Sequence, residues 1–193
     1  MSEAPRLSTG RLLLRPWRER DKPAWAALNA DPQVMEHFPA TLTEEQSGEM
    51  VDRMIASWRD RGMGWWAVER LDSGATVGGV AITAPMWDAW FTPCVEVGWR
   101  LAREHWGHGF APEAARAAID WGFAELDPPN DEIVSFTTVH NDRSRRVMEK
   151  LGFVHDPADD FDHPLLGDWH QARHVLYRMS RPRWVELSGG AGA

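Results

Sequence analysis

The order of strand-like and helical segments is the feature of this sequence that most constrains its fold. Three stretches rich in β-branched and aromatic residues are separated by turn residues and predict an antiparallel meander. Helical and strand-like periodicity then alternates, which predicts a mixed sheet with helices packed on it. The meander stretches are 64–71, 75–85 and 94–102, and the later segments are a helix at 111–126, a strand at 132–140, a helix at 142–153 and a strand at 172–181. The expected fold class is therefore α/β (α+β).

The first sixty residues predict a strand followed by two helices. The stretch "RLLLRPWRERD" (11–21) is typical of a strand that ends in a polar turn, and the helix after it is broken by Pro32. Thr43 is placed to cap the second helix. A chain of 193 residues is long enough for one substantial core. We expect a single domain over residues 1–185 and a flexible tail over 186–193.

Composition indicates an ordinary globular protein without a nucleic-acid partner. Hydrophobic residues make up 43% and charged residues 26% of the chain. The 29 acidic residues outnumber the 21 basic ones, so the summed field repels a phosphate backbone. The apolar run Leu12–Leu14 is too short for a signal-peptide core or a membrane span, so we expect a cytoplasmic protein with no membrane partner. The single cysteine, Cys94, excludes an internal disulfide and a thiolate-rich metal site, and its apolar neighbours predict burial.

The stretch "WGHGFAPEAAR", residues 106–116, is a candidate anion site. Gly107 and Gly109 permit a tight loop, and Pro112 suits the first turn of a helix. The start of a helix carries unpaired N–H groups and a partial positive charge, and it can therefore hold a phosphate. The stretch lacks the Lys-Ser/Thr ending of a nucleotide P-loop and the G-x-G-x-x-G spacing of a dinucleotide fold, which argues against ATP and NAD. A glycine pair ahead of a helix also occurs for geometry alone.

A second predicted helix start carries an unusual charge. Arg143, Arg145 and Arg146 occupy its first turn, where the helix dipole favours acidic residues. A polyanion lying over the helix would compensate for this arrangement. The alternative is that the arginines pair with acidic neighbours such as Asp142 and Glu149 on a solvated face.

At these residues the chain resembles the GNAT superfamily of N-acetyltransferases. Its members bind the pyrophosphate of acetyl-coenzyme A on a loop of pattern Q/R-x-x-G-x-G/A. In the corresponding loop, Trp106 to Ala111, Gly109 and Ala111 match the pattern and Trp106 replaces the usual Gln or Arg, as in the RimJ/RimL-like branch. The stretches "LSTGRLLLRPWRERD", "ADPQVMEHFP", "VEVGWRLA" and "NDRSRRVMEKLGF" are similar to the same branch. The resemblance spans residues 7–180.

The resemblance implies a GNAT fold, in which a mixed, splayed central sheet has helices on both faces. The opening between the fourth and fifth strands would hold the pantetheine arm of acetyl-coenzyme A, the implied co-substrate. The fourth strand, Val95 to Leu101, would pair with the pantetheine amides and supply an N–H near the thioester oxygen. The residues implied to bind acetyl-coenzyme A are Trp99, Arg100, Leu101, Trp106, Gly107, His108, Gly109, Phe110, Ala111, Asn141, Ser144 and Arg146. Asn141 could equally serve only as a helix cap.

Acetyl transfer to an amine requires a neutral nitrogen, stabilisation of an oxyanion and a proton for the departing thiolate. Many family members use a tyrosine as the proton donor, but Met148 stands at the matching position and cannot donate. Ser144, one helical turn earlier, is the candidate donor. Glu96 is the first candidate for the base, with Glu104 and His105 as alternatives. A free α-amine has a pKa of about 7.7 to 8, so a water chain could also suffice.

Two other residue patterns, a histidine pair and a group of tryptophans, could also contribute to a site. His170 and His174 have the spacing of a helical zinc pair, but Gln171 stands where the metalloprotease motif requires Glu. We therefore expect no bound metal. Aromatic residues near strands usually fill a core. We expect one or two of four central tryptophans to line an acceptor pocket: Trp65, Trp66, Trp87 and Trp90.

The resemblance predicts an enzyme that transfers acetyl from acetyl-coenzyme A to a primary amine by direct transfer in a ternary complex. The acceptor is either the N-terminal α-amine of a protein or a small-molecule amine. The net charge of −8 favours a cationic acceptor at long range. The alternative is a non-catalytic acyl-coenzyme A-binding module of the same fold, against which Ser144 and Glu96 argue. The resemblance leaves a monomer and a homodimer open.

Overall fold

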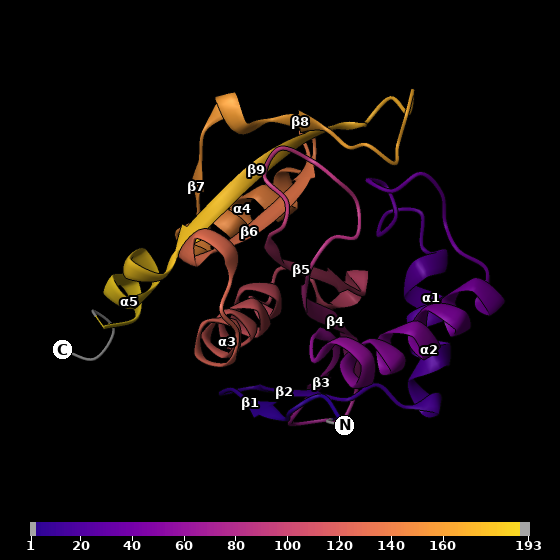
Figure 1. Ribbon diagram of the computed structural model, residues 1–193. Helices are drawn as coiled ribbons and strands as arrows, with labels where there is room; N and C mark the ends of the chain where they lie inside the picture. Colours follow the sequence, from indigo (N-terminus) through magenta and orange to yellow (C-terminus); the bar gives the residue numbers. More distant parts are fainter. Residues whose placement is uncertain (1–2, 190–193) are drawn as a thin grey trace.

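The computed structural model describes residues 3–189, whose strands form one nine-stranded sheet (Figure 1). The order across the sheet is β1-β2-β3-β4-β5-β6-β9-β7, and β8 pairs with β9 off this path. The strands are β1 (Leu7–Ser8), β2 (Leu12–Arg15), β3 (Gly64–Arg70), β4 (Thr76–Thr83), β5 (Val95–Leu101), β6 (Glu132–Thr138), β7 (Val154–His155), β8 (Phe161–Asp162) and β9 (Arg173–Ser180). The α-helices are α1 (Lys22–Ala30), α2 (Glu44–Arg61), α3 (Phe110–Glu125), α4 (Asp142–Leu151) and α5 (Arg181–Gly189).

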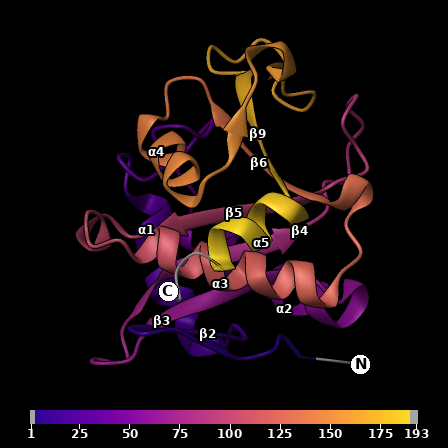
Figure 2. The same ribbon diagram turned by 90° about the vertical axis from the view of Figure 1, so that its left-hand side faces the viewer.

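Helices cover both faces of the sheet, and Figure 2 shows α3 and α5 in front of the strands. Strand β3 distinguishes the two faces, because successive side chains of a strand point to opposite sides. Trp66 and Val68 belong to the core that contains the apolar side of α3, whereas Ala67 belongs to the core that contains residues of α1 and α2. The predicted mixed sheet with helices on both faces is confirmed.

The predicted meander is also confirmed, because β3 pairs with β4 and β4 pairs with β5, both antiparallel. A two-residue strand, β1, pairs with β2 ahead of them, so the strand expected as the fourth is β5. Helix α2 begins as predicted at Thr43, whose side chain accepts a hydrogen bond from the Gln46 amide. The Gln46 side chain in turn accepts from the Thr43 amide, which completes a capping box.

The sheet splays apart between β5 and β6, which are its parallel neighbours. Their ladder contains only the pairs Val95↔Ile133 and Glu96↔Val134. Beyond Glu96, β6 stays paired with β9 through Thr138, whereas β5 has β4 as its only ladder partner. Within residues 3–189 the second half of β5 therefore has no strand partner on the side of β6, and its backbone edge faces the space between the two strands, with the Leu101 carbonyl bonded by the Trp106 indole.

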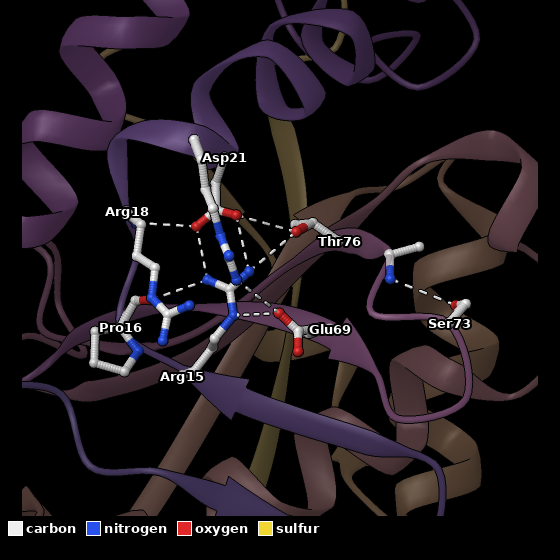
Figure 3. A network of polar contacts seen from close by, with 9 residues as sticks. Arg15, Pro16, Arg18, Asp21, Glu69, Ser73 and Thr76 are labelled. Carbon is white, nitrogen blue, oxygen red and sulfur yellow. Dashed lines mark hydrogen bonds and ion pairs between the residues drawn. The ribbon is translucent and has the colours of Figure 1, made fainter.

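A buried polar network fixes the connection between β2 and α1 (Figure 3). Arg15, with 1% of its side chain exposed, donates to both carboxylate oxygens of Asp21 at 2.7 and 2.8 Å. Arg15 also donates to Glu69 on β3 at 2.7 Å, and Thr76 on β4 bonds to both Arg15 and Asp21. Two acidic side chains thus compensate the buried guanidinium, and the network joins β2, β3 and β4 to the start of α1.

The chain end differs from the expected boundary at residue 185. Residues 186–189 belong to α5, because Trp184 is buried and its Nε1 donates to Asp120 of α3 at 2.7 Å. This tertiary contact holds a helix in place where the sequence predicts a flexible tail. The remaining residues of the expected tail, 190–193, lie outside the described residues.

Two expectations from composition can be compared with the structure. Cys94 is buried as predicted, and burial raises the pKa of its thiol to about 12. The thiol is therefore protonated at neutral pH and serves packing rather than nucleophilic chemistry. Across residues 3–189, no helix combines the length and apolar character needed to cross a bilayer.

Candidate active site

The splay between β5 and β6 opens into a cavity of about 630 Å³, a size typical of ligand pockets. Its walls come from β5 and β6, the loop before α3, the first turns of α3 and α4, the segment between α1 and α2, and the loop between β8 and β9. All but one of the residues implied to bind the acyl carrier line it: Trp99, Arg100, Leu101, Trp106, Gly107, Gly109, Phe110, Ala111, Asn141, Ser144 and Arg146. His108 does not; its ring stacks on Phe110 outside the cavity lining.

The loop before α3 presents free backbone donors at one end of the cavity. Gly109 is the N-cap residue of α3, with φ of 78°, and no side chain caps the helix. The amides of Phe110 and Ala111 therefore have no partner within the helix, and Pro112 has no N–H. A Cβ on Gly107 would meet no protein atom within 4 Å, so its φ of 78° rather than crowding explains the glycine.

Arg11 of the β1–β2 turn holds this loop from outside. Its Nη1 donates to the carbonyl of His108 at 2.9 Å, and its Nη2 lies 2.6 Å from the Glu113 carboxylate. Glu113 also accepts hydrogen bonds from Thr9 and from the Arg11 amide. The acidic residue in the first turn of α3 is thus neutralised by Arg11, and it does not oppose an anion at the helix start.

The contacts of Trp106 explain why a tryptophan can replace the Gln or Arg of the family pattern. Its indole Nε1 donates to the Leu101 carbonyl at 2.9 Å, which connects the end of β5 to the glycine loop. The guanidinium of Arg143 lies 4.4 Å from the centre of its ring. Trp106 therefore shapes the loop by packing and by one hydrogen bond, where a Gln or Arg would present a polar end.

The three arginines at the start of α4 have different environments. Arg143 pairs with Glu36 at 2.6 Å, and Arg145 donates to the Val139 carbonyl and the Tyr177 hydroxyl. Neither uses Asp142 or Glu149 as its hydrogen-bond partner. Arg146 is exposed, lines the cavity and makes no hydrogen bond or ion pair with any residue in the described range. Arg146 is therefore the arginine of α4 left available for a polyanion.

The remaining α4 residues divide between capping and the cavity. Asn141 caps the helix, because its Oδ1 accepts from the Ser144 amide at 3.1 Å and its Nδ2 donates to Thr137. The Ser144 hydroxyl lines the cavity and makes no hydrogen bond within residues 3–189. Met148 is fully buried in the core, and the hydroxyl of Tyr177 is held by Glu149 at 3.1 Å. Ser144 is thus the side-chain hydroxyl that α4 offers to the cavity.

Glu96 is a carboxyl group with an unusual protonation equilibrium. It lies on β5 in the cavity wall, and burial raises its pKa to about 8. No hydrogen bond from the described residues stabilises its charged form. Glu104, one of the two alternative candidates for the base, is in contrast exposed and outside the cavity lining, which argues against that role. His105 does line the cavity, and burial lowers the pKa of its imidazole, with Arg70 and His108 adding repulsion.

The other wall of the cavity contains residues that the sequence patterns did not identify. They come from the segment between α1 and α2 and from the loop between β8 and β9, and they include His37, Phe38, His163, Leu166 and Trp169. These segments have no periodicity, and only the fold brings them together.

Of the four candidate tryptophans, Trp65 lines the cavity. Trp66 is fully buried against Trp58 and Trp121, Trp87 packs on Phe136 and Phe161, and Trp90 is 60% exposed. The site therefore uses one of them, within the expected one or two.

His170 and His174, the candidate zinc pair, do not lie on a helix, which their spacing would require. His174 lies on β9 and is buried, whereas His170 lies exposed in the preceding loop, so the two do not share a helix face. Across residues 3–189, no group of three or more His, Cys, Asp or Glu side chains is arranged to hold a metal ion.

Comparisons with known proteins agree with this geometry. The family model of the acetyltransferase (GNAT) domain matches residues 11–154. The chain is 31% identical over 153 residues to the uncharacterized protein YkkB of Bacillus subtilis, covering 79% of this chain and 87% of that protein. It is 28% identical over 200 residues to the FsC-acetyl coenzyme A-N(2)-transacetylase of Aspergillus fumigatus, covering 95% of this chain and 79% of that protein.

The fold is also that of a solved acetyltransferase structure. Mycobacterium smegmatis RimJ, in complex with CoA-disulfide, superimposes with a TM-score of 0.71 at 21% identity, covering 92% of this chain and 89% of that chain. The splayed sheet, the glycine loop at the start of α3 and the family match thus lead to one assignment. The chain belongs to the GNAT acetyltransferase family and is an acetyl-transferring enzyme.

Proposed function

We propose that this enzyme transfers an acetyl group from acetyl-coenzyme A to a primary amine by direct transfer in a ternary complex. The observation that carries the proposal is the unpaired edge of β5, which leads along the cavity to the uncapped start of α3. Unpaired strand amides and carbonyls need partners, and an extended pantetheine arm offers amides in the manner of an added strand. The names of the Aspergillus transacetylase and the RimJ complex support this carrier.

The charged end of the carrier fits the glycine loop. The free amides of Phe110 and Ala111 suit a diphosphate at a helix start. Arg146 adds a cation on the facing helix, with no competing partner among the described residues. A loop of this kind needs no metal ion to hold the phosphates.

The chemistry divides between two side chains and the strand backbone. When bound, acetyl-coenzyme A supplies an activated thioester. The amine nitrogen forms a bond to the acetyl carbon, the carbon–sulfur bond breaks, the amine loses a proton and the thiolate gains one. Glu96 in its ionised form accepts the amine proton, and Ser144 donates a hydrogen bond to the departing sulfur. Backbone N–H groups of β5 between Trp99 and Leu101 stabilise the oxygen that becomes negative.

Thiol release from acetyl-coenzyme A across a panel of primary amines tests the proposal. We expect release with at least one amine, and an acetylated product of the corresponding mass. Glu96→Gln is expected to lower kcat/KM by about a hundredfold or more, as for a lost general base. Glu104→Gln is the matched control, since that carboxylate is exposed outside the cavity. Calorimetric binding of acetyl-coenzyme A without release on any amine would favour a non-catalytic binding module instead.

A further inference from the structure

Arg100 of β5 points to the acceptor side of the cavity. Its neighbours Trp99 and Leu101 pack on the core under α3, so the alternation of the strand turns Arg100 toward α1. Its Nη1 donates to the Asn29 side chain of α1 at 2.7 Å. Its guanidinium lies 4.1 Å from the centre of the Phe38 ring, in the segment after α1. The guanidinium thus faces α1 and the segment after it, and no contact with the glycine loop is found within residues 3–189.

Arg100 is a half-buried cation without an acidic partner. Within residues 3–189 its sole hydrogen bond is to the neutral amide oxygen of Asn29, and its Nε is buried with no acceptor. Burial lowers the pKa of its guanidinium to about 10, and no carboxylate offsets this effect. Arg15, which is fully buried, is compensated by both Asp21 and Glu69. A charge that is partly removed from water and has no counter-ion is unfavourable, so Arg100, which lines the cavity, is suited to bind an anion there.

Near Phe38, the segment after α1 is bonded to the loop before β9. His37 Nδ1 lies 2.8 Å from Gln171 Oε1, and Gln171 Nε2 donates to the Glu36 carbonyl at 3.0 Å. Thr138 at the end of β6 bonds to the same Gln171 oxygen at 3.2 Å. These contacts join the segment after α1 to the loop before β9 across the cavity.

We propose that the acceptor is a small primary amine that carries a carboxylate, and that Arg100 binds this carboxylate while the amine faces the acetyl group. Free α-amino acids are the simplest members of this class. The inference rests on the proposed function and narrows its acceptor. The net charge of −8 favours cations at long range, but Arg100 determines the local charge, because Glu96 on the same strand is largely neutral at pH 7.

The test compares each free α-amino acid with its C-terminal amide as acceptor, by thiol release from acetyl-coenzyme A. Values of kcat/KM are corrected for the fraction of each amine that is neutral. Hydrogen bonds to charged groups contribute about 1.5 to 3 kcal/mol, so the best acid should exceed its amide by about 10- to 100-fold. Arg100→Met should abolish most of that ratio, and Arg100→Lys should retain part of it. Arg103→Met, at an exposed arginine outside the cavity, should leave the ratio unchanged.

The outcomes separate the two proposals. No thiol release with any amine contradicts the proposed function itself. Transfer that ignores the carboxylate, in the wild type or in an Arg100→Met protein with a normal melting curve, overturns only the inference. Loss of acetyl-coenzyme A binding in Arg100→Met with an unchanged acid-to-amide ratio would assign Arg100 to the carrier instead. Faster acetylation of peptides that begin with Asp than of any free amino acid would overturn the small-molecule acceptor.

Discussion

The raised pKa of Glu96 has a consequence for stability that can be measured without any substrate. A carboxyl that titrates at about 8 in the folded protein, against 4.5 in its unperturbed state, binds a proton that the unfolded chain has already released. Stability must therefore fall as the pH rises from about 5 to 8 and level off above, because the folded state binds more protons over that range. At 1.36 kcal/mol per pKa unit, the loss between pH 5 and pH 8 is about 3 to 4 kcal/mol.

Glu96→Gln removes this dependence, since the amide resembles the protonated carboxyl in shape and stays neutral. Urea unfolding at pH 5, 6.5 and 8 should show the variant gaining on the wild type by about 3 to 4 kcal/mol over the range. Glu104→Gln should show no such trend, because that side chain is exposed. A difference between wild type and Glu96→Gln that is the same at every pH would refute the reasoning, and with it a base that becomes active near pH 8.

Three further substitutions test the fold and the site. Asp21→Asn leaves Arg15 with a weakened partner and should cost about 3 to 5 kcal/mol in denaturant unfolding, whereas Asp60→Asn, on an exposed pair, should leave the free energy of unfolding nearly unchanged. Burial alone would raise the pKa of Asp21, but the hydrogen bonds and charge of Arg15 lower it overall. The ionised Asp21 carboxylate therefore contributes fully to wild-type stability above the usual Asp pKa, and this contribution is lost as the pH falls below about 4. Gly109→Ala should weaken the binding of acetyl-coenzyme A, measured by calorimetry, about tenfold, because a side chain at positive φ adds a strain of about 1 to 2 kcal/mol to the loop. Gly62→Ala introduces the same strain at the end of α2 and should leave the binding of acetyl-coenzyme A unchanged. Ser144→Ala should lower kcat about tenfold or less, since a thiol of pKa about 8.5 leaves readily, and a loss above a thousandfold would contradict that minor role.

The sequence predicts those parts of the fold where local pattern and tertiary structure agree. Alternating residues identify β3, β4 and β5, and Thr43 with Gln46 marks the start of α2. The two-residue strands β1, β7 and β8 are shorter than any period can indicate. The sequence does not predict helix α5 because contacts with distant segments hold it in place, such as Trp184 with Asp120, 64 residues apart, and Arg183 with the Gly152 carbonyl.

The candidate site divides in the same way. The carrier side consists of one strand, one loop and one helix start, each a continuous stretch of sequence, and the resemblance to the family implies these residues from its motifs. The acceptor side depends on contacts between distant segments, such as His37 with Gln171, 134 residues apart. The half-buried state of Arg100 likewise depends on α1 and the following segment, which place Asn29 and Phe38 against it. Neither residue type nor spacing reveals that Glu96 loses its charge and that Arg100 lacks an acidic partner.

The presence or absence of an acidic partner distinguishes an arginine that supports the fold from one that is available to a ligand. Arg15 is fully buried and Arg100 is half-buried, and both lie on strands, but two carboxylates bond to Arg15 and none bonds to Arg100. Removing Arg15 leaves buried carboxylates unpaired, so Arg15→Met should destabilise the protein by about 3 to 5 kcal/mol. Removing Arg100 leaves no unpaired acid but takes the donor from the buried amide oxygen of Asn29, so Arg100→Met should cost about 1 to 3 kcal/mol in the same unfolding experiment, less than Arg15→Met. Equal destabilisation by the two substitutions would mean that Arg100 supports the fold, and that its missing partner does not indicate a ligand.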